Sequence, residues 1–261
     1  MSRPHALVTG ASAGLGREFA RLFAADGWNV ILVARRKERL EELAAKLVAA
    51  HSIDAVVIAA DLSDPASPRQ VHTQVVAAGR RVDVLVNNAG FGTNGAFAEL
   101  DPAREMAMVQ VNVAALVELT RLFLPNMIER GHGHVLNVGS TAGFQPGPFM
   151  ATYCASKAFV NSFTEALAEE LRGTGVSATV SCPGATATEF SKISGNDTAA
   201  LFQNGVVASA AEVARHAYVA MKYRRAVAVP GLMNKVAMQA LRLTPRAVAR
   251  RVAAGIIRGK P

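Results

Sequence analysis

The sequence predicts an α/β fold built on a doubly wound parallel sheet of about seven strands, with helices on both faces. Apolar runs rich in β-formers alternate with helix-like segments, which is the pattern of a parallel sheet covered on both sides. The 261 residues are 51% hydrophobic and 18% charged, as in a packed globular protein. A glycine-rich segment follows the first predicted strand and opens the first predicted helix. Together these observations favour a nucleotide-binding α/β domain over a disordered or fibrous chain.

Predicted strands and helices follow one another in regular order. Asp26-Gly27 and Gly173-Thr174-Gly175 have the composition of turns that end helices. Residues 191–205 are the least periodic stretch and the candidate for a mobile loop. The predicted strands are residues 6–9, 29–34, 55–60, 82–86, 134–139, 176–182 and 226–229, and the predicted helices include residues 16–26, 37–50, 102–130 and 152–173.

The predicted organisation is one domain over residues 1–230 followed by a basic amphipathic C-terminal extension over residues 231–261. The chain has no apolar run of about eighteen residues, so we expect no transmembrane helix. The first strand is reached by Ala6, so we expect no signal peptide. Cys154 and Cys182 lack the spacing of metal ligands or of a disulfide framework, so we expect no metal site. These features suit a cytoplasmic protein.

The formal net charge of +8 comes from one end of the chain. From Lys222 onward there are ten Lys or Arg residues and no Asp or Glu. The rest of the chain carries 18 basic and 20 acidic residues, a net charge of −2. The basicity is therefore local, and it does not make the predicted domain a nucleic-acid binder. Aromatic stacking residues are also scarce in the basic segment.

Residues 232–257 have the spacing of an amphipathic helix, with apolar positions such as Val248 and Val252 and intervening arginines such as Arg246 and Arg250. Three alternatives stay open. The segment packs on its own domain or on a sister subunit; or it lies peripherally on an anionic membrane surface, as basic amphipathic helices do; or it covers the mouth of the substrate site.

A phosphate-binding turn is predicted between residues 9 and 16, which read TGASAGLG. Gly10, Gly14 and Gly16 permit a tight turn and a close approach of the backbone, and the start of the following helix presents unpaired N–H groups to an anion. Ser12 and Leu15 lie in the same segment and complete the predicted set. A doubly wound sheet with this turn after its first strand is a Rossmann-type arrangement. A plain glycine-rich turn is the alternative.

The residues at the end of the second predicted strand indicate which dinucleotide, NAD or NADP, the protein binds. An acidic residue about twenty positions after the glycine turn would bind the adenosine ribose and repel a 2′-phosphate. Arg35 and Arg36 stand there instead, and a guanidinium can both fork onto a phosphate and stack on adenine. We therefore expect NADP in preference to NAD. Two solvated arginines at a strand end, with Glu38 nearby, are the alternative.

Tyr153 and Lys157 stand four positions apart on a predicted helix, so their side chains share one face. Ser140 lies thirteen residues upstream, after a predicted strand. Together with the glycine turn and the segment Asn87-Asn88-Ala89-Gly90, this order of motifs resembles the short-chain dehydrogenase/reductase family. The resemblance runs from about Ala6 to about Pro230, and it rests on the combination because each motif alone is common.

The resemblance implies the roles of the reacting groups. Tyr153 acts as general acid in carbonyl reduction, or as general base in alcohol oxidation, and Lys157 binds the nicotinamide ribose. A nearby ammonium is expected to lower the pKa of the phenol from about 10. Ser140 steadies the carbonyl oxygen as charge develops. Asn112 matches the family's fourth active-site residue, whose amide binds a backbone carbonyl and a water linked to Lys157; a purely structural role in the helix is the alternative.

The resemblance also implies further contacts to the cofactor. Asp61 and Leu62 match the pair that contacts adenine, with a helix cap as the alternative for Asp61. Small residues after the fourth strand let the backbone approach the adenosine ribose. The region after the sixth strand contacts the nicotinamide. The residues concerned are Asp61, Leu62, Asn88, Ala89, Gly90, Pro183, Gly184, Thr186 and Thr188.

The sequence therefore predicts an NADP-dependent oxidoreductase that interconverts a carbonyl group and an alcohol by hydride transfer. An apolar surround suits a lipophilic ketone, aldehyde or acyl derivative, although phenylalanines also pack cores. The candidates for that surround are Phe91, Phe144, Phe149, Met150, Phe190 and Phe202. A homo-oligomer, dimer or tetramer, is expected by analogy with the family. A noncatalytic nucleotide-binding scaffold or redox-sensing protein is the alternative from another class.

Overall fold

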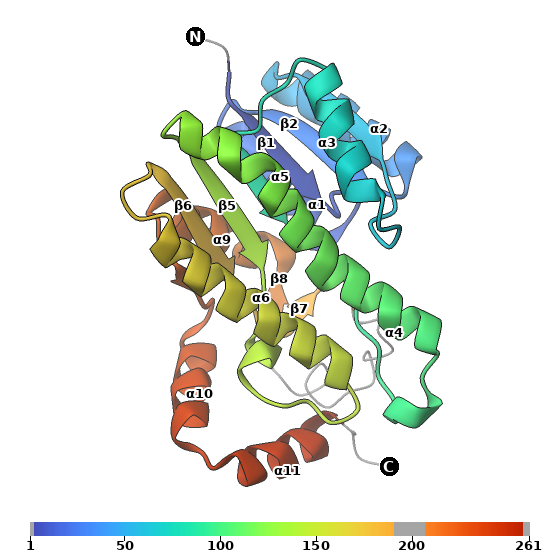
Figure 1. The fold of residues 1–261 in the computed structure, drawn as a ribbon, viewed down its shortest axis with the longest axis vertical. Helices are drawn as coiled ribbons and strands as arrows, with labels where there is room; N and C mark the ends of the chain where they lie inside the picture. Colours follow the sequence, from blue (N-terminus) through green and yellow to red (C-terminus); the bar gives the residue numbers. More distant parts are fainter. Residues whose placement is uncertain (1–2, 191–206, 258–261) are drawn as a thin grey trace.

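A parallel sheet of seven strands forms the centre of the protein, seen in a computed structural model that describes residues 3–190 and 207–257 (Figure 1). The strand order is β3-β2-β1-β4-β5-β6-β9, and every neighbouring pair is parallel. The predicted α/β class and doubly wound sheet are confirmed. The strands are β1 (His5–Thr9), β2 (Asn29–Ala34), β3 (Ala55–Ala59), β4 (Val84–Asn87), β5 (Gly133–Val138), β6 (Val176–Ser181) and β9 (Val227–Ala228).

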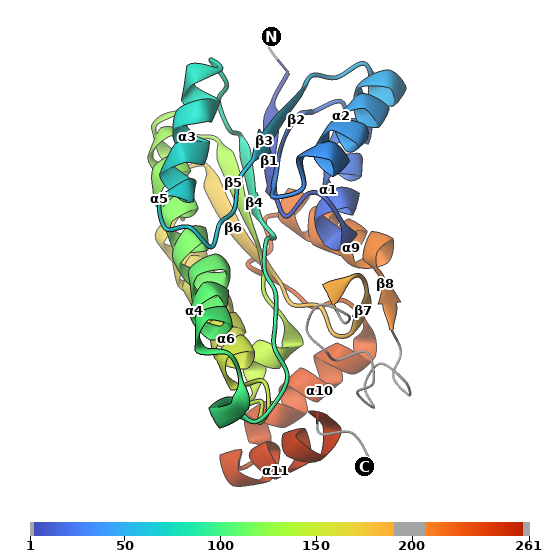
Figure 2. The ribbon, with the colours of Figure 1, turned by 90° about the vertical axis from the view of Figure 1, so that its right-hand side faces the viewer.

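Helices cover both faces of the sheet (Figure 2). Strand β1 shows why: Ala6 and Val8 pack into the core beneath one helical layer, while Leu7 between them packs into the core beneath the other. Because side chains alternate along a strand, a sheet that is apolar at every position needs a cover on each face. One layer holds α1 (Gly14–Ala25), α2 (Lys37–His51) and α9 (Ala210–Lys222); the other holds α3 (Ser67–Ala77), α5 (Ala115–Glu129) and α6 (Ala151–Glu170).

The strand order reverses at β1, which lies between β2 and β4. Chain segments leaving the carboxyl ends of β1 and β4 therefore diverge to opposite faces and leave a crevice between them. The Thr9–Gly16 turn, the segment after Asn87 and the segment after Val138 all start from this edge of the sheet. The fold thus gathers the predicted motifs at one end of the molecule.

The long helix predicted over residues 102–130 is interrupted. It consists of α4 (Pro102–Val109), a π-helical turn η2 (Gln110–Ala114) and α5. Asn112 lies in the π-helical turn, and such bulges are frequent at functional sites. By length and composition the run Pro102–Glu129 could cross a membrane; here its inner face packs on the sheet through residues such as Leu119 and Phe123.

Helices α3 and α9 are absent from the predicted set. Ser209 and Glu212 form a capping box at the start of α9, a sequence signal that hydrophobic periodicity overlooks. In α3 the buried valines are Val71 and Val75, and two positions are too few to show a helical periodicity in the sequence. The structure also contains a short parallel pair, β7 (Thr186–Ala187) with β8 (Ala208–Ser209). The predicted mobile loop over residues 191–205 lies outside the described residues.

The C-terminal extension forms two helices, α10 (Leu232–Leu243) and α11 (Arg246–Ile257), where the sequence predicts one. The break falls at Thr244, whose backbone is extended, with φ −83° and ψ 127°. Pro245 follows it, and the ring of a proline disfavours the helical conformation in the residue before it. Figure 1 shows the two helices beyond the carboxyl ends of the strands, beside the end of the molecule that gathers the motifs.

Candidate active site

The glycine turn is shaped by crowding as much as by backbone conformation. Gly10 and Gly14 have φ of 65° and 51°, in the left-handed region that favours glycine. A Cβ on Gly10 would lie 2.8 Å from Nδ2 of Asn88, and a Cβ on Gly16 would collide with the carbonyl oxygen of Gly10. No side chain among the described residues caps the start of α1 at Ala13, and Ala13, Gly14 and Leu15 line the cavity described below.

Thr9 joins the glycine turn to the segment after β4. Its hydroxyl accepts hydrogen bonds from the backbone N–H groups of Asn88 and Ala89 at 2.9 and 3.0 Å. The Asn88 amide in turn donates to the Thr9 carbonyl at 2.8 Å. The two chain ends at the sheet crevice are therefore held as one unit, although they lie 79 positions apart.

Arginines gather at the far end of this unit. The Arg36 guanidinium donates to the Ser12 hydroxyl, with Nη2 at 3.0 Å, and to the Glu189 carboxylate at 2.9 Å. Arg39 binds the same carboxylate at 2.9 Å. Hydrogen bonds from Arg36 and Arg39 hold the pKa of Glu189 below its ordinary value. Arg35 lies 3.9 Å from Asp61. The cluster is a cationic site that already holds one anionic group.

Tyr153 and Lys157 lie one turn apart on α6 and are both buried. The Lys157 ammonium donates to the Val138 carbonyl at 2.7 Å and lies 5.9 Å from the centre of the Tyr153 ring. Phe190 packs on the other side of the phenol, with ring centres 5.3 Å apart. The two groups are thus near each other, but the ammonium donates its hydrogen bond to the backbone at the end of β5.

Burial dominates the protonation of this pair. It raises the pKa of Tyr153 above its ordinary value, against a lowering by the hydrogen bond with Ser140. Burial also lowers the pKa of Lys157 to about 8. The expected lowering of the phenol pKa is therefore wrong for the protein alone, because loss of hydration outweighs the lowering by the Ser140 hydrogen bond. At neutral pH the phenol keeps its proton.

Ser140 lies between β5 and the tyrosine. It begins a 3-10 turn, Thr141–Phe144, and its hydroxyl accepts from the Ala142 N–H at 3.1 Å. The Asn161 amide donates to the Ser140 carbonyl at 3.1 Å. Sequence reasoning missed Asn161, although it follows Lys157 by four positions and so shares the face of α6 that carries Tyr153. Helix α6 thus holds the serine loop directly.

The Asn112 amide is fully paired by protein groups. Its Nδ2 donates to the Phe91 carbonyl and to the Ser156 hydroxyl, both at 3.0 Å, and its Oδ1 accepts from the Phe91 N–H at 3.1 Å. A Cβ on Gly90 would lie 3.0 Å from this oxygen and 3.6 Å from the Lys157 nitrogen. Asn112 therefore ties the segment after β4 to α6, close to Lys157.

The turn after β6 closes the site from the opposite side. The Pro183 carbonyl accepts from the Thr141 N–H at 3.0 Å. The Thr186 hydroxyl donates to the Gly184 carbonyl at 3.0 Å, so it braces its own turn. The methyl group of Thr188 would lie 3.2 Å from a Cβ on Gly14, so Thr188 packs against the glycine turn.

Most of these groups border one cavity of about 1010 Å³. Every predicted catalytic and cofactor-binding residue lines it except Gly16 and Asn112, which lie just behind its wall. Of the predicted apolar surround, Phe91, Met150 and Phe190 line the cavity. Phe144 packs in a small core cluster instead, Phe149 is outside the wall, and Phe202 lies outside the described residues.

The C-terminal helices supply the rest of the wall beside these apolar residues. One face of α10 and part of α11 line the cavity. Among the three alternatives for this segment, these contacts support the cover over the site's mouth, and the packing of Met238 on a core cluster also supports contact with the chain's own domain. The lining residues from the segment are Asn234, Ala237, Met238, Ala240, Leu241, Thr244, Val252 and Ala253.

The residues present fit a nicotinamide dinucleotide. A glycine cradle at an uncapped helix start suits the pyrophosphate, and the cationic cluster suits an adenosine phosphate. Residues 3–190 and 207–257 contain no group of three His, Cys, Asp or Glu side chains able to hold a metal ion. The arrangement can thus supply a buried proton donor beside a cofactor site.

A model of the short chain dehydrogenase family matches residues 4–199. The chain belongs to this family. Sulfoacetaldehyde reductase 2 of Chromohalobacter salexigens is 43% identical over 197 residues, which cover 74% of this chain and 77% of the relative. NADP-dependent 3-hydroxy acid dehydrogenase YdfG of Escherichia coli K12 is 38% identical, over 72% of this chain and 75% of the relative.

The fold agrees with solved members of the family. A short-chain dehydrogenase from Sphingobium yanoikuyae in complex with NADPH superposes with a TM-score of 0.82 and 32% identity, over 93% of this chain and 96% of that one. The protein is thus an oxidoreductase of the short-chain dehydrogenase family, acting on alcohol and carbonyl groups with a nicotinamide cofactor. The family match ends at residue 199, so α10 and α11 lie beyond it.

Proposed function

We propose that this short-chain dehydrogenase is an NADP-dependent carbonyl reductase in which Tyr153 is the general acid. The observation that carries this proposal is the buried phenol at the wall of the cavity, hydrogen-bonded to Ser140 and one helical turn from Lys157. A phenol whose pKa is raised by burial holds its proton at neutral pH. The resting phenol can therefore donate a proton, as the reduction of a carbonyl requires.

Each residue has a distinct part in this reaction. The bound nicotinamide supplies the hydride. Tyr153 gives its proton to the carbonyl oxygen, and the Ser140 hydroxyl steadies that oxygen as negative charge develops. Lys157, with a pKa of about 8, is largely charged at pH 7 and stabilises the phenolate left behind. Asn112 donates hydrogen bonds to the Phe91 carbonyl and the Ser156 hydroxyl and so fixes these groups close to Lys157.

Arginines at the adenosine end support NADP over NAD. Arg35 and Arg36 both line the cavity, and Arg36 already binds a carboxylate through a charge-assisted hydrogen bond of 2.9 Å. An incoming 2′-phosphate has the same chemistry. Arg35→Asp and Arg36→Asp should each raise the KM for NADPH at least about tenfold and leave that for NADH within about threefold. Equal losses with both cofactors would contradict the assignment.

An apolar wall supports a lipophilic ketone, aldehyde or acyl derivative as substrate. Phe91, Met150 and Phe190 face the cavity together with Met238 and Leu241 from α10. Arg104 also lines the cavity and lies 5.8 Å from the Phe91 ring centre. That cation favours a second substrate class, a small carbonyl compound carrying an acidic group, as the names of the two relatives suggest.

A carbonyl panel with NADPH tests the function. Lipophilic ketones, long-chain 3-oxoacyl thioesters and small 3-oxo or sulfonate aldehydes form its three arms, and oxidation of the cofactor is followed by absorbance. Tyr153→Phe should lower kcat by at least about 100-fold while cofactor binding is retained. Cofactor binding by the unaltered protein without turnover on any arm would instead favour a noncatalytic scaffold or redox sensor.

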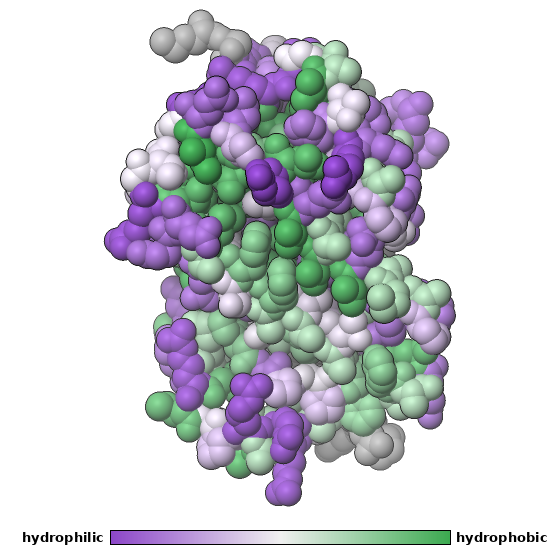
Figure 3. All heavy atoms as spheres, in the orientation of Figure 1, coloured by the Kyte–Doolittle hydropathy of each residue, from purple (hydrophilic) through white to green (hydrophobic). Residues whose placement is uncertain are grey.

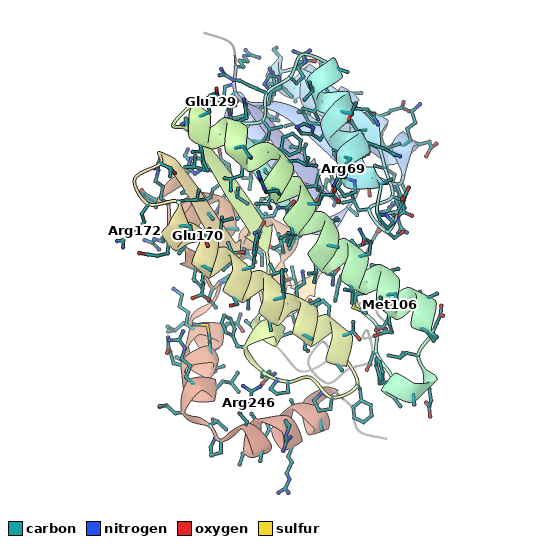
Figure 4. The ribbon with its side chains drawn as sticks, in the orientation of Figure 1. Arg69, Met106, Glu129, Glu170, Arg172 and Arg246 are labelled. Atoms are coloured by element: carbon teal, nitrogen blue, oxygen red, sulfur yellow. The ribbon has the colours of Figure 1, made fainter. Side chains whose placement is uncertain are left out.

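A homo-oligomer in the cytoplasm is part of the proposal. Apolar side chains gather over α4, α5 and α6 in Figure 3, and Met106 points outward from α4 in Figure 4. Met106, Ile128 and Phe159 are 67%, 40% and 42% exposed, which suits contact with a second copy. Light scattering of the unaltered protein and of Met106→Lys tests this. Contact of the C-terminal extension with an anionic membrane surface stays a prediction, to be tested by sedimentation with liposomes with and without residues 231–261.

A further inference from the structure

The C-terminal segment meets the catalytic machinery at Asn234. This residue is third in α10, after Gly231, whose φ of 84° turns the chain into the helix. Its side-chain nitrogen donates to the Pro230 carbonyl at 2.8 Å, which fixes the orientation of the amide. The half-buried amide lines the cavity. It is therefore a polar group held in place where the apolar wall meets the turn after β6.

The Asn234 amide rests directly on Gly184. A Cβ on Gly184 would lie 2.9 Å from both Nδ2 and Oδ1 of Asn234 and 3.2 Å from its Cγ. The φ of Gly184 lies outside the left-handed region, so its backbone would accept a side chain. The three nearest atoms to that Cβ all belong to Asn234. Within the described residues, a side chain at position 184 would therefore first meet this one amide, which would have to move aside.

The same turn is bonded to the catalytic serine loop. The carbonyl of Pro183, adjacent to Gly184, accepts from the Thr141 N–H at 3.0 Å and from the Ser140 hydroxyl at 3.4 Å. A continuous chain of contacts therefore runs from α10 through the Asn234 amide and the Pro183–Gly184 turn to Ser140. Three elements far apart in the sequence meet in it.

We propose that Asn234 is a positioning residue that presses the Pro183–Gly184 turn against Ser140 and Thr141, so that the seating of α10 sets the place of the catalytic hydroxyl. The substrate wall and the serine then move together, because one amide joins them. The catalytic consequence rests on the proposed function; the structural coupling does not.

Asn234→Ala removes the contact and leaves the helix intact. We expect kcat to fall roughly tenfold, since a small displacement of a stabilising group is costly, while the dissociation constant for NADPH stays within about threefold. Hydrogen exchange at the Thr141 amide should speed up in the same variant. Gln239→Ala is the matched control, because Gln239 is exposed on the same helix and does not line the cavity. A kcat and a Thr141 exchange rate that match those of the control would overturn the proposal.

A second pair of variants tests the contact by exchange of volume. Gly184→Ala alone should lower kcat at least about tenfold, because its methyl group meets the Asn234 amide. In the Asn234→Ala background the same methyl fills the space left by the amide, so Gly184→Ala should be neutral or restore activity and slow exchange at Thr141. An equal loss from Gly184→Ala in both backgrounds would overturn the proposal. If the unaltered protein turns over no carbonyl, the exchange data still decide the coupling, and only the proposed function fails.

Discussion

The Glu189 carboxylate occupies the arginine cluster that we assign to the 2′-phosphate of NADP. Arg36 and Arg39 each donate to it at 2.9 Å. A phosphate that binds these guanidinium groups must displace the carboxylate or share the site with its negative charge. Replacement of Glu189 by the isosteric glutamine removes that charge, so Glu189→Gln should tighten the binding of NADPH.

The size of the effect follows from the exposure of the two ion pairs. The side chains of Arg36, Arg39 and Glu189 are 41%, 49% and 46% exposed, so each pair belongs with surface salt bridges. Such pairs contribute about 0.2–1 kcal/mol each to stability. Removing the Glu189 charge from both pairs should therefore make the free energy of NADPH binding more favourable by about 1 kcal/mol. The dissociation constant for NADPH should therefore fall about fivefold.

Titration of the protein with NADPH and NADH, followed by nicotinamide fluorescence, measures the change. NADH lacks the 2′-phosphate, so its dissociation constant should change less than about twofold. The NADPH advantage should shrink at high salt, because the groups are exposed. Glu41→Gln is the control: it removes a carboxylate from α2 that pairs with Lys37 and not with the cluster. An unchanged or weakened affinity for NADPH in Glu189→Gln would refute the reasoning.

Three further outcomes are expected. Met238→Trp should fill part of the cavity and lower kcat/KM for bulky ketones at least about tenfold more than for small aldehydes, because Met238 lines the wall; equal losses would place the substrate elsewhere. Burial lowers the pKa of His134 to about 4, below its unfolded value of about 6.5. The free energy of unfolding should therefore fall as the pH drops from about 6.5 toward 4, because the unfolded chain takes up the proton first. His134→Asn should lessen that fall, as measured by urea titrations. Lys157→Met should abolish turnover and yet raise the melting temperature, at pH 7 more than at pH 10. Burial lowers the pKa of Lys157 to about 8, so below that pH the folded protein holds a buried charge that destabilises it, and methionine removes that charge.

Local sequence signals predicted much of the site. Gly10 and Gly14 predict a turn with positive φ, which the structure has. The spacing of Tyr153 and Lys157 predicts that they share one face of a helix. Their elements are adjacent in a doubly wound sheet, so the cavity that unites them follows from the order of strands. Asn112 was predicted from the resemblance to the family, but its place in a π-helical turn and its pairing with the Phe91 backbone are visible only in the structure.

Contacts between distant segments were not predictable in this way. Arg36 meets Glu189 across 153 positions. Asn234 meets Gly184 because the chain turns at Gly231 and places the start of α10 over the cavity. The pKa of Tyr153 was predicted in the wrong direction for a related reason: spacing reveals the neighbouring ammonium, but the loss of water depends on everything packed around the phenol.

Short-range pattern by itself determined the class of fold, the phosphate-binding turn and the shared helix face of Tyr153 and Lys157, because strand alternation, glycine conformation and helix spacing are properties of a few consecutive residues. The roles of the reacting groups came from the resemblance of the combined motifs to the family. Tertiary structure alone decided the protonation of those groups, the occupant of the arginine cluster and the wall formed by the C-terminal helices. Each of these depends on burial or on contacts between segments that only the folded chain brings together.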